Sequence, residues 1–84
     1  MAKPIIQRTQ TGVRIESSLL KVLKGLAEYA GLSLGDLLEG IVLHAFEGKA
    51  PFSEETRKVI DQLKEVYGCE LSAKDSHQLV EEEM

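Results

Sequence analysis

The chain has 84 residues, a net charge of −4 and a single cysteine, Cys69. This length fits one small domain, and a lone cysteine excludes an intrachain disulfide and the usual zinc-ligand spacings. Because so short a chain buries a limited core, we expect it to gain stability by associating with further copies.

The N-terminal segment is predicted to be an arm followed by a short strand. Residues 1–8, which include Pro4, have no periodic pattern and are interpreted as a flexible arm. From Thr9 to Ile15 the chain alternates, with Thr11, Val13 and Ile15 on one side and Gln10, Gly12 and Arg14 on the other. Period-2 alternation with β-branched residues on one side predicts a strand with one buried face.

Two helices are predicted next. Ser17 or Ser18 offers an N-cap for the first helix, and Gly31 is placed to end it in the left-handed conformation. "SLGD" at 33–36 has the form of a capping box, and the apolar stripe that follows ends before Gly48. Leu43 lies off this stripe, so we expect a second surface to cover it.

Residues 52–84 are predicted to form a C-terminal helical extension. Ser53 can cap a helix that ends at Gly68, and "SAKD" at 72–75 could start a last helix through about Val80. The favoured interpretation is that the longer helix packs back on the protein and covers Leu43. The alternative is that the extension binds a protein partner, as acidic tails often do.

The single strand determines the predicted fold. A lone strand needs a partner for its N–H and C=O groups, and no second β pattern is present in the sequence. The fold class expected is therefore mostly α, with an antiparallel two-stranded ribbon formed between the chains of a homodimer. A two-stranded ribbon fits the major groove of DNA.

The stretch "TGVRIESSLLKVLKGLAEYAGLSLGDLLEGIVLHAF" resembles the ribbon-helix-helix family of bacterial DNA-binding proteins, the Arc, MetJ and CopG-like repressors. The resemblance covers a module of residues 9–47 and rests on an alternating strand with arginine, a leucine-rich helix, a glycine turn and a Ser-capped second helix. It implies a homodimeric, sequence-specific DNA-binding protein, and more narrowly a transcriptional repressor that inserts its ribbon into the major groove.

The resemblance also implies roles for individual residues. Base contacts fall on Gln10, Gly12 and Arg14. Phosphate contacts fall on Lys3, Arg8, Ser33, Leu34 and Gly35. The dimer core comprises Val13, Ile15, Leu23, Leu38, Ile41 and Val42. Gly12 departs from the family pattern, because it has no side chain to read a base.

The distribution of charge is uneven along the chain. Residues 1–24 carry five basic residues and one acidic residue, a balance of +4, whereas residues 25–84 carry five basic and thirteen acidic residues, a balance of −8. If two chains associate through their N-terminal parts, the basic regions add into one patch. Two alternatives remain open: an antitoxin whose residues 52–84 bind a toxin, and a dimeric interaction scaffold that binds no DNA.

Candidates for catalysis or metal binding are scarce. His44 and His77 are isolated, and no nucleophile–base pair or Gly-rich phosphate loop is recognisable. We therefore expect no enzyme activity, cofactor or metal. No apolar stretch approaches the roughly 18 residues of a membrane span, the N-terminus lacks a secretion signal, and a lone thiol suits a reducing compartment. A cytoplasmic protein without membrane contact is predicted.

Overall fold

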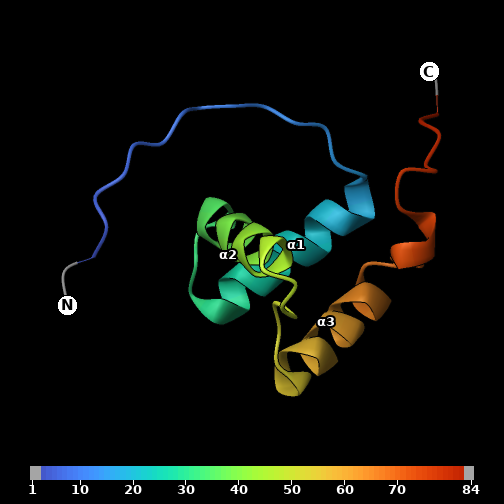
Figure 1. The fold of residues 1–84 in the computed structure, drawn as a ribbon. Coiled ribbons are helices and arrows are strands. Elements are labelled where there is room, and N and C mark those ends of the chain that lie inside the picture. Colours follow the sequence, from blue (N-terminus) through green and yellow to red (C-terminus); the bar gives the residue numbers. More distant parts are fainter. Residues whose placement is uncertain (1–2, 83–84) are drawn as a thin grey trace.

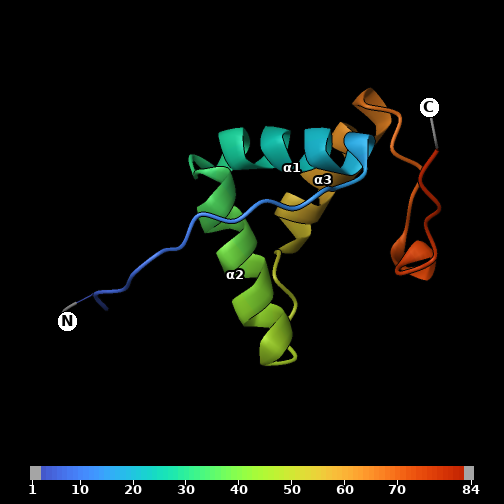
Figure 2. The same ribbon diagram turned by 90° about the horizontal axis from the view of Figure 1, so that it is seen from above.

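The computed structural model describes residues 3–82 of the chain. It contains three α-helices, α1 (Ser17–Ala30), α2 (Leu34–Phe46) and α3 (Glu54–Val66), and one 3-10 turn, η1 (Ala73–Asp75). Both α2 and α3 pack against α1. Residues 3–16 leave the start of α1, pass α2 and then project away from the helices as an extended arm (Figures 1 and 2). Of the predicted arm and extension, residues 1–2 and 83–84 lie outside the described part.

The first helix begins one residue earlier than its serines suggest. Its N-cap is Glu16, whose side chain accepts hydrogen bonds from the Leu19 amide at 2.9 Å and the Ser18 hydroxyl at 2.6 Å. The prediction of Ser17 or Ser18 as the cap is wrong, because both serines lie within the helix. Gly31 ends α1 at φ 69°, as predicted, where a residue with a side chain is strained.

The two later helices begin where predicted. Ser33 Oγ accepts a hydrogen bond from the Asp36 amide at 3.1 Å, and Ser53 Oγ accepts one from the Thr56 amide at 3.2 Å. The last predicted helix is wrong in length, since only the single turn η1 forms. The backbone leaves the helical region at Ser76 (ψ 130°) and turns left-handed at His77 (φ 64°).

The predicted ribbon-helix-helix fold is wrong. Within residues 3–82 every regular element is helical, and a ribbon-helix-helix needs a β-ribbon. Residues 9–15 belong to no strand, and none of their backbone groups has a hydrogen-bond partner in the described chain. Of the face expected to be buried, Thr11 and Val13 are exposed and only Ile15 is half-buried. Seven alternating residues are therefore insufficient to make a strand without a partner.

The core lies where α1 meets the other two helices. Leu26, Ala27 and Leu37 are buried at its centre. Partly buried side chains surround them: Leu23, Ile41, Phe52, Val59, Ile60 and Leu63. A Cβ placed on Gly25 would lie 3.1 Å from Leu63 Cδ2, so the missing side chain lets α3 approach α1 closely.

Packing of α3 on α1 leaves the far side of α2 uncovered. Leu43 is 61% exposed. The prediction that the extension covers Leu43 is wrong, because α3 follows α1 and forms no substantial packing with α2.

Candidate interaction surface

The arm is attached to α2 through one arginine. Arg8 Nε and one terminal nitrogen donate hydrogen bonds to the two carboxylate oxygens of Glu39 at 3.0 and 2.9 Å. The same terminal nitrogen lies 3.1 Å from Asp36 Oδ1. Arg8 was expected to contact DNA phosphate, but here its guanidinium bridges two carboxylates of the same chain. This bridge holds the arm against the first turns of α2.

The charges of this bridge stabilise one another. The hydrogen bond from Arg8 lowers the pKa of Glu39 below its ordinary value. The same hydrogen bond and the charge of Glu39 raise the pKa of Arg8. All three side chains are roughly half exposed, so solvent screens the attraction and the bridge positions the arm more than it stabilises the fold.

The residues predicted to touch bases do not form a joint surface. Gln10, Gly12 and Arg14 follow one another along the exposed arm, and nothing lies within 4 Å of a Cβ built on Gly12. Arg14 forms an ion pair with Glu81 near the other end of the chain. Lys3 is exposed on the same arm. The positions are thus accessible, but the described chain has no ribbon to orient them.

The start of α2 contains the other predicted phosphate contacts. Ser33 is the N-cap, Leu34 is half-buried and Gly35 is exposed. Helix N-termini favour anions. The first turn of α2, however, already contains the Asp36 carboxylate, which forms an ion pair with Arg8. The first turn of α2 therefore already contains a carboxylate of its own chain.

The residues predicted to form a dimer core divide into two groups. Leu23 and Ile41 pack into the core of their own chain, and Ile15 and Leu38 are half-buried. Val13 and Val42 are exposed. The core expected between two chains is thus used in part within one chain.

An apolar surface remains on the second half of α2. Val42 and its neighbour Leu43 are 43% and 61% exposed, and Phe46, about one helical turn further on, is 81% exposed; we call these three residues the α2 face. The arm adds further apolar side chains in the open: Ile5, Ile6 and Val13. Sequence reasoning did not predict that Phe46 is exposed. The sequence did indicate a second apolar surface on this helix, because Leu43 lies off the stripe that faces the core.

The described residues offer no sign of a metal site or a membrane span. Within residues 3–82, no group of three or more His, Cys, Asp and Glu side chains could hold a metal ion. None of the helices described is both long and apolar enough to cross a membrane. Comparisons of the chain with protein-family models, curated proteins and solved structures found no match.

Proposed function

We propose that the protein is a homodimeric interaction module whose chains associate through the α2 face and the arm. The supporting observation is the surface that one chain exposes. Its accessible area is 7712 Å², whereas a compact monomer of this mass exposes about 5,000 Å². Its radius of gyration is 14.4 Å, against about 12 Å for a compact domain of this length.

The excess area is large enough for an interface. A standard protein–protein interface removes about 800 Å² from each partner. Val42, Leu43 and Phe46 supply an apolar centre of the kind that contributes most of the binding energy in such interfaces. Because the α2 face is apolar rather than charged, a matching apolar surface suits it, and a second copy provides one by symmetry.

Charge also favours a second copy as the partner. The arm, residues 3–16, carries three basic residues and one acidic residue, whereas residues 25–84 have a balance of −8, so the arm of one chain complements the acidic helices of another. Within one chain, Arg8 already binds carboxylates of α2, which illustrates the kind of contact that the arm can make.

The experiment is sedimentation velocity of the full chain over a range of concentrations. We expect a species of twice the 9.3 kDa chain mass. Leu43→Asp places a charge at the centre of the α2 face and should weaken the dimer about 30-fold or more, as for a hot-spot residue.

Val66→Asp is the matched control, because Val66 is 73% exposed on α3, away from the α2 face. It should leave the dimer unchanged. A wild-type chain that stays monomeric at every accessible concentration would refute the proposal. So would equal dimerisation of the two variants.

DNA binding by the arm is a second candidate function. It is favoured by the exposure of Lys3, Arg14, Lys21 and Lys24 in the basic part of the chain. Without a ribbon, such binding would rest on phosphate contacts and be insensitive to base sequence. The ion pairs of Arg8 and Arg14 with carboxylates weigh against it. The antitoxin alternative has less support, because α3 is already packed on α1.

Fluorescence anisotropy with a labelled duplex tests this second function. Binding should weaken steeply with salt, with a log–log slope of about −0.9 for each phosphate contacted. Lys3→Gln combined with Arg14→Gln should reduce the slope, whereas Lys58→Gln on α3 should not. If an intact dimer bound no DNA at low salt, DNA binding would be refuted and the interaction module would be the one remaining proposal.

A further inference from the structure

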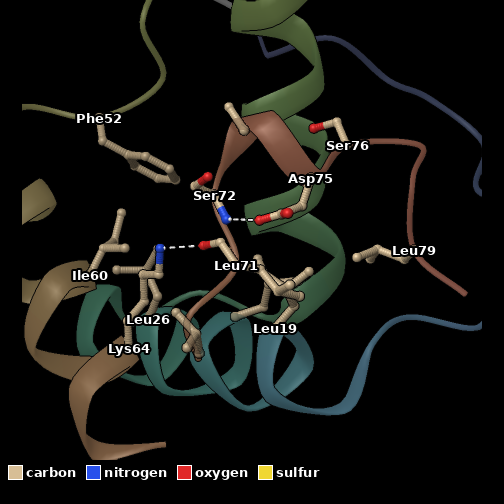
Figure 3. A pocket seen from close by; sticks show the side chains of 13 residues that line it. Leu19, Leu26, Phe52, Ile60, Lys64, Leu71, Ser72, Asp75, Ser76 and Leu79 are labelled. Carbon is tan, nitrogen blue, oxygen red and sulfur yellow. Dashed lines mark hydrogen bonds between the residues drawn. The ribbon is translucent and has the colours of Figure 1, made fainter. Parts of the chain in front are cut away.

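A cleft separates the C-terminal segment from the helices. It has a volume of about 370 Å³ and lies between α1, α3 and residues 71–79 (Figure 3). Its walls are mainly apolar and include Leu19, Leu23, Leu26, Phe52, Ile60 and Leu79. This volume is within the range of small-molecule sites, which combine apolar walls with a few polar groups.

The polar groups of the cleft come from α3 and from residues 71–76. Lys64 Nζ donates a hydrogen bond to the Leu71 carbonyl oxygen at 2.6 Å, and Asp75 Oδ2 accepts one from the Ser72 amide at 2.8 Å (Figure 3). Asp75 thus caps η1 within its own segment. Ser72 and Ser76 add hydroxyl groups to the lining.

Lys64 has unused capacity to bind an anion. An ammonium group has three N–H donors, and the described structure gives Lys64 one acceptor. Among residues 3–82, no carboxylate oxygen lies within 4.0 Å of its nitrogen, and the side chain is half-buried. A partly desolvated ammonium without a counter-ion favours a negatively charged ligand group.

We propose that this cleft binds a small amphipathic carboxylate, with its alkyl chain along the leucine-rich wall and its carboxylate at Lys64. A neutral ligand would fill the wall equally well but leave the ammonium without a counter-ion. A cationic ligand would be repelled by Lys64. The cleft includes no residue of the α2 face or the arm, so this inference is independent of the proposed dimer.

Isothermal titration calorimetry of the full chain with sodium octanoate and with octan-1-ol tests the proposal. Octanoate should bind once per chain, and octan-1-ol about tenfold more weakly, because it lacks the charge-assisted hydrogen bond. Equal affinity for the two compounds, or no octanoate binding, would overturn the assignment of Lys64 or of the cleft.

Three variants locate the site. Lys64→Gln should lower octanoate affinity to that of octan-1-ol, whereas Lys58→Gln, at an exposed lysine of the same helix outside the cleft, should change neither. Leu79→Asp, at a half-exposed wall residue, should weaken both ligands. Circular dichroism confirms that each variant is folded.

Amide shifts in an NMR titration supply a readout that does not depend on any variant. Octanoate should shift residues 19–26 and 71–79. Shifts confined to Val42, Leu43 and Phe46 would show adsorption on the α2 face and would contradict the proposal.

Discussion

Helices α2 and α3 have the same length but differ in how they use apolar residues. Each has thirteen residues and a serine N-cap, and each packs on α1. Helix α3 has four apolar residues, and three of them, Val59, Ile60 and Leu63, contribute to the core. Helix α2 has eight apolar residues, but only two of them, Leu37 and Ile41, contribute to the core.

The difference shows which helix has its apolar surface covered within one chain. In α3 a narrow apolar stripe faces α1 and the other side is mostly charged, as in an ordinary surface helix. In α2 the apolar surface extends round to the α2 face, beyond what α1 can cover. A helix that is apolar on two sides is normally covered on both, so the excess on α2 is what indicates a partner.

The largest expected effect concerns the core that both helices share. Leu26 is 2% exposed and packs among residues of α2 and α3, so Leu26→Ala should cost about 2–5 kcal/mol of unfolding free energy. Urea denaturation measures this. Val66→Ala, at an exposed residue of α3, should stay within about 0.5 kcal/mol. Similar costs for the two variants would mean that α1 does not organise the core.

The next effect compares the two N-caps. Ser33→Ala and Ser53→Ala each remove a hydroxyl that accepts a backbone N–H, and each should cost about 1 kcal/mol. Chemical denaturation of the two variants side by side is the measurement. If only Ser53→Ala destabilised the protein, the start of α2 would be held by the Arg8 bridge rather than by its cap.

A smaller and opposite effect is expected within α2. Nothing lies within 4 Å of a Cβ on Gly40, so Gly40→Ala should stabilise the chain by about 0.5–1 kcal/mol through its better helix propensity. Thermal unfolding should show a higher midpoint. Gly31→Ala is the contrasting variant, because φ at this position is 69° and alanine is strained there. If Gly40→Ala lost the dimer, this would show that the interface includes Gly40.

The smallest effect concerns the pH dependence of the arm. Because the pKa of Glu39 is lowered in the folded chain, the bridge to Arg8 is fully present above the ordinary pKa of a glutamate. It is lost as the pH falls through the lowered value. An NMR titration of the Glu39 carboxyl group should follow this, and Arg8→Gln should return its pKa to the ordinary range. An unchanged pKa in that variant would show that the arm does not lie on α2.

Features determined by local contacts could be predicted from the sequence. Ser33 and Ser53 cap their helices, and Gly31 ends α1, because each acts on backbone groups within a few residues. The N-cap of α1 was misassigned because the longer Glu16 side chain reaches the Leu19 amide as a serine would. The short η1 turn shows that a capping box can form without an α-helix following it.

Features determined by distant contacts could not be predicted in the same way. Whether residues 9–15 form a strand depends on a partner that the local pattern cannot supply. Arg8 looked available for phosphate because its carboxylate partners lie 28 and 31 positions away. The cleft at Lys64 likewise depends on how residues 71–79 fold back, and no motif marks it.

Gly25 has a consequence for how this chain can evolve. With Leu63 Cδ2 only 3.1 Å from where a Cβ would lie, alanine could be accepted if Leu63 shifts by a few tenths of an ångström. A branched residue would push α3 off α1. Substitutions at position 25 should therefore be limited to the smallest residues, unless the side chain at position 63 is replaced by a smaller one at the same time. Diverged copies of this sequence are expected to change these two positions together.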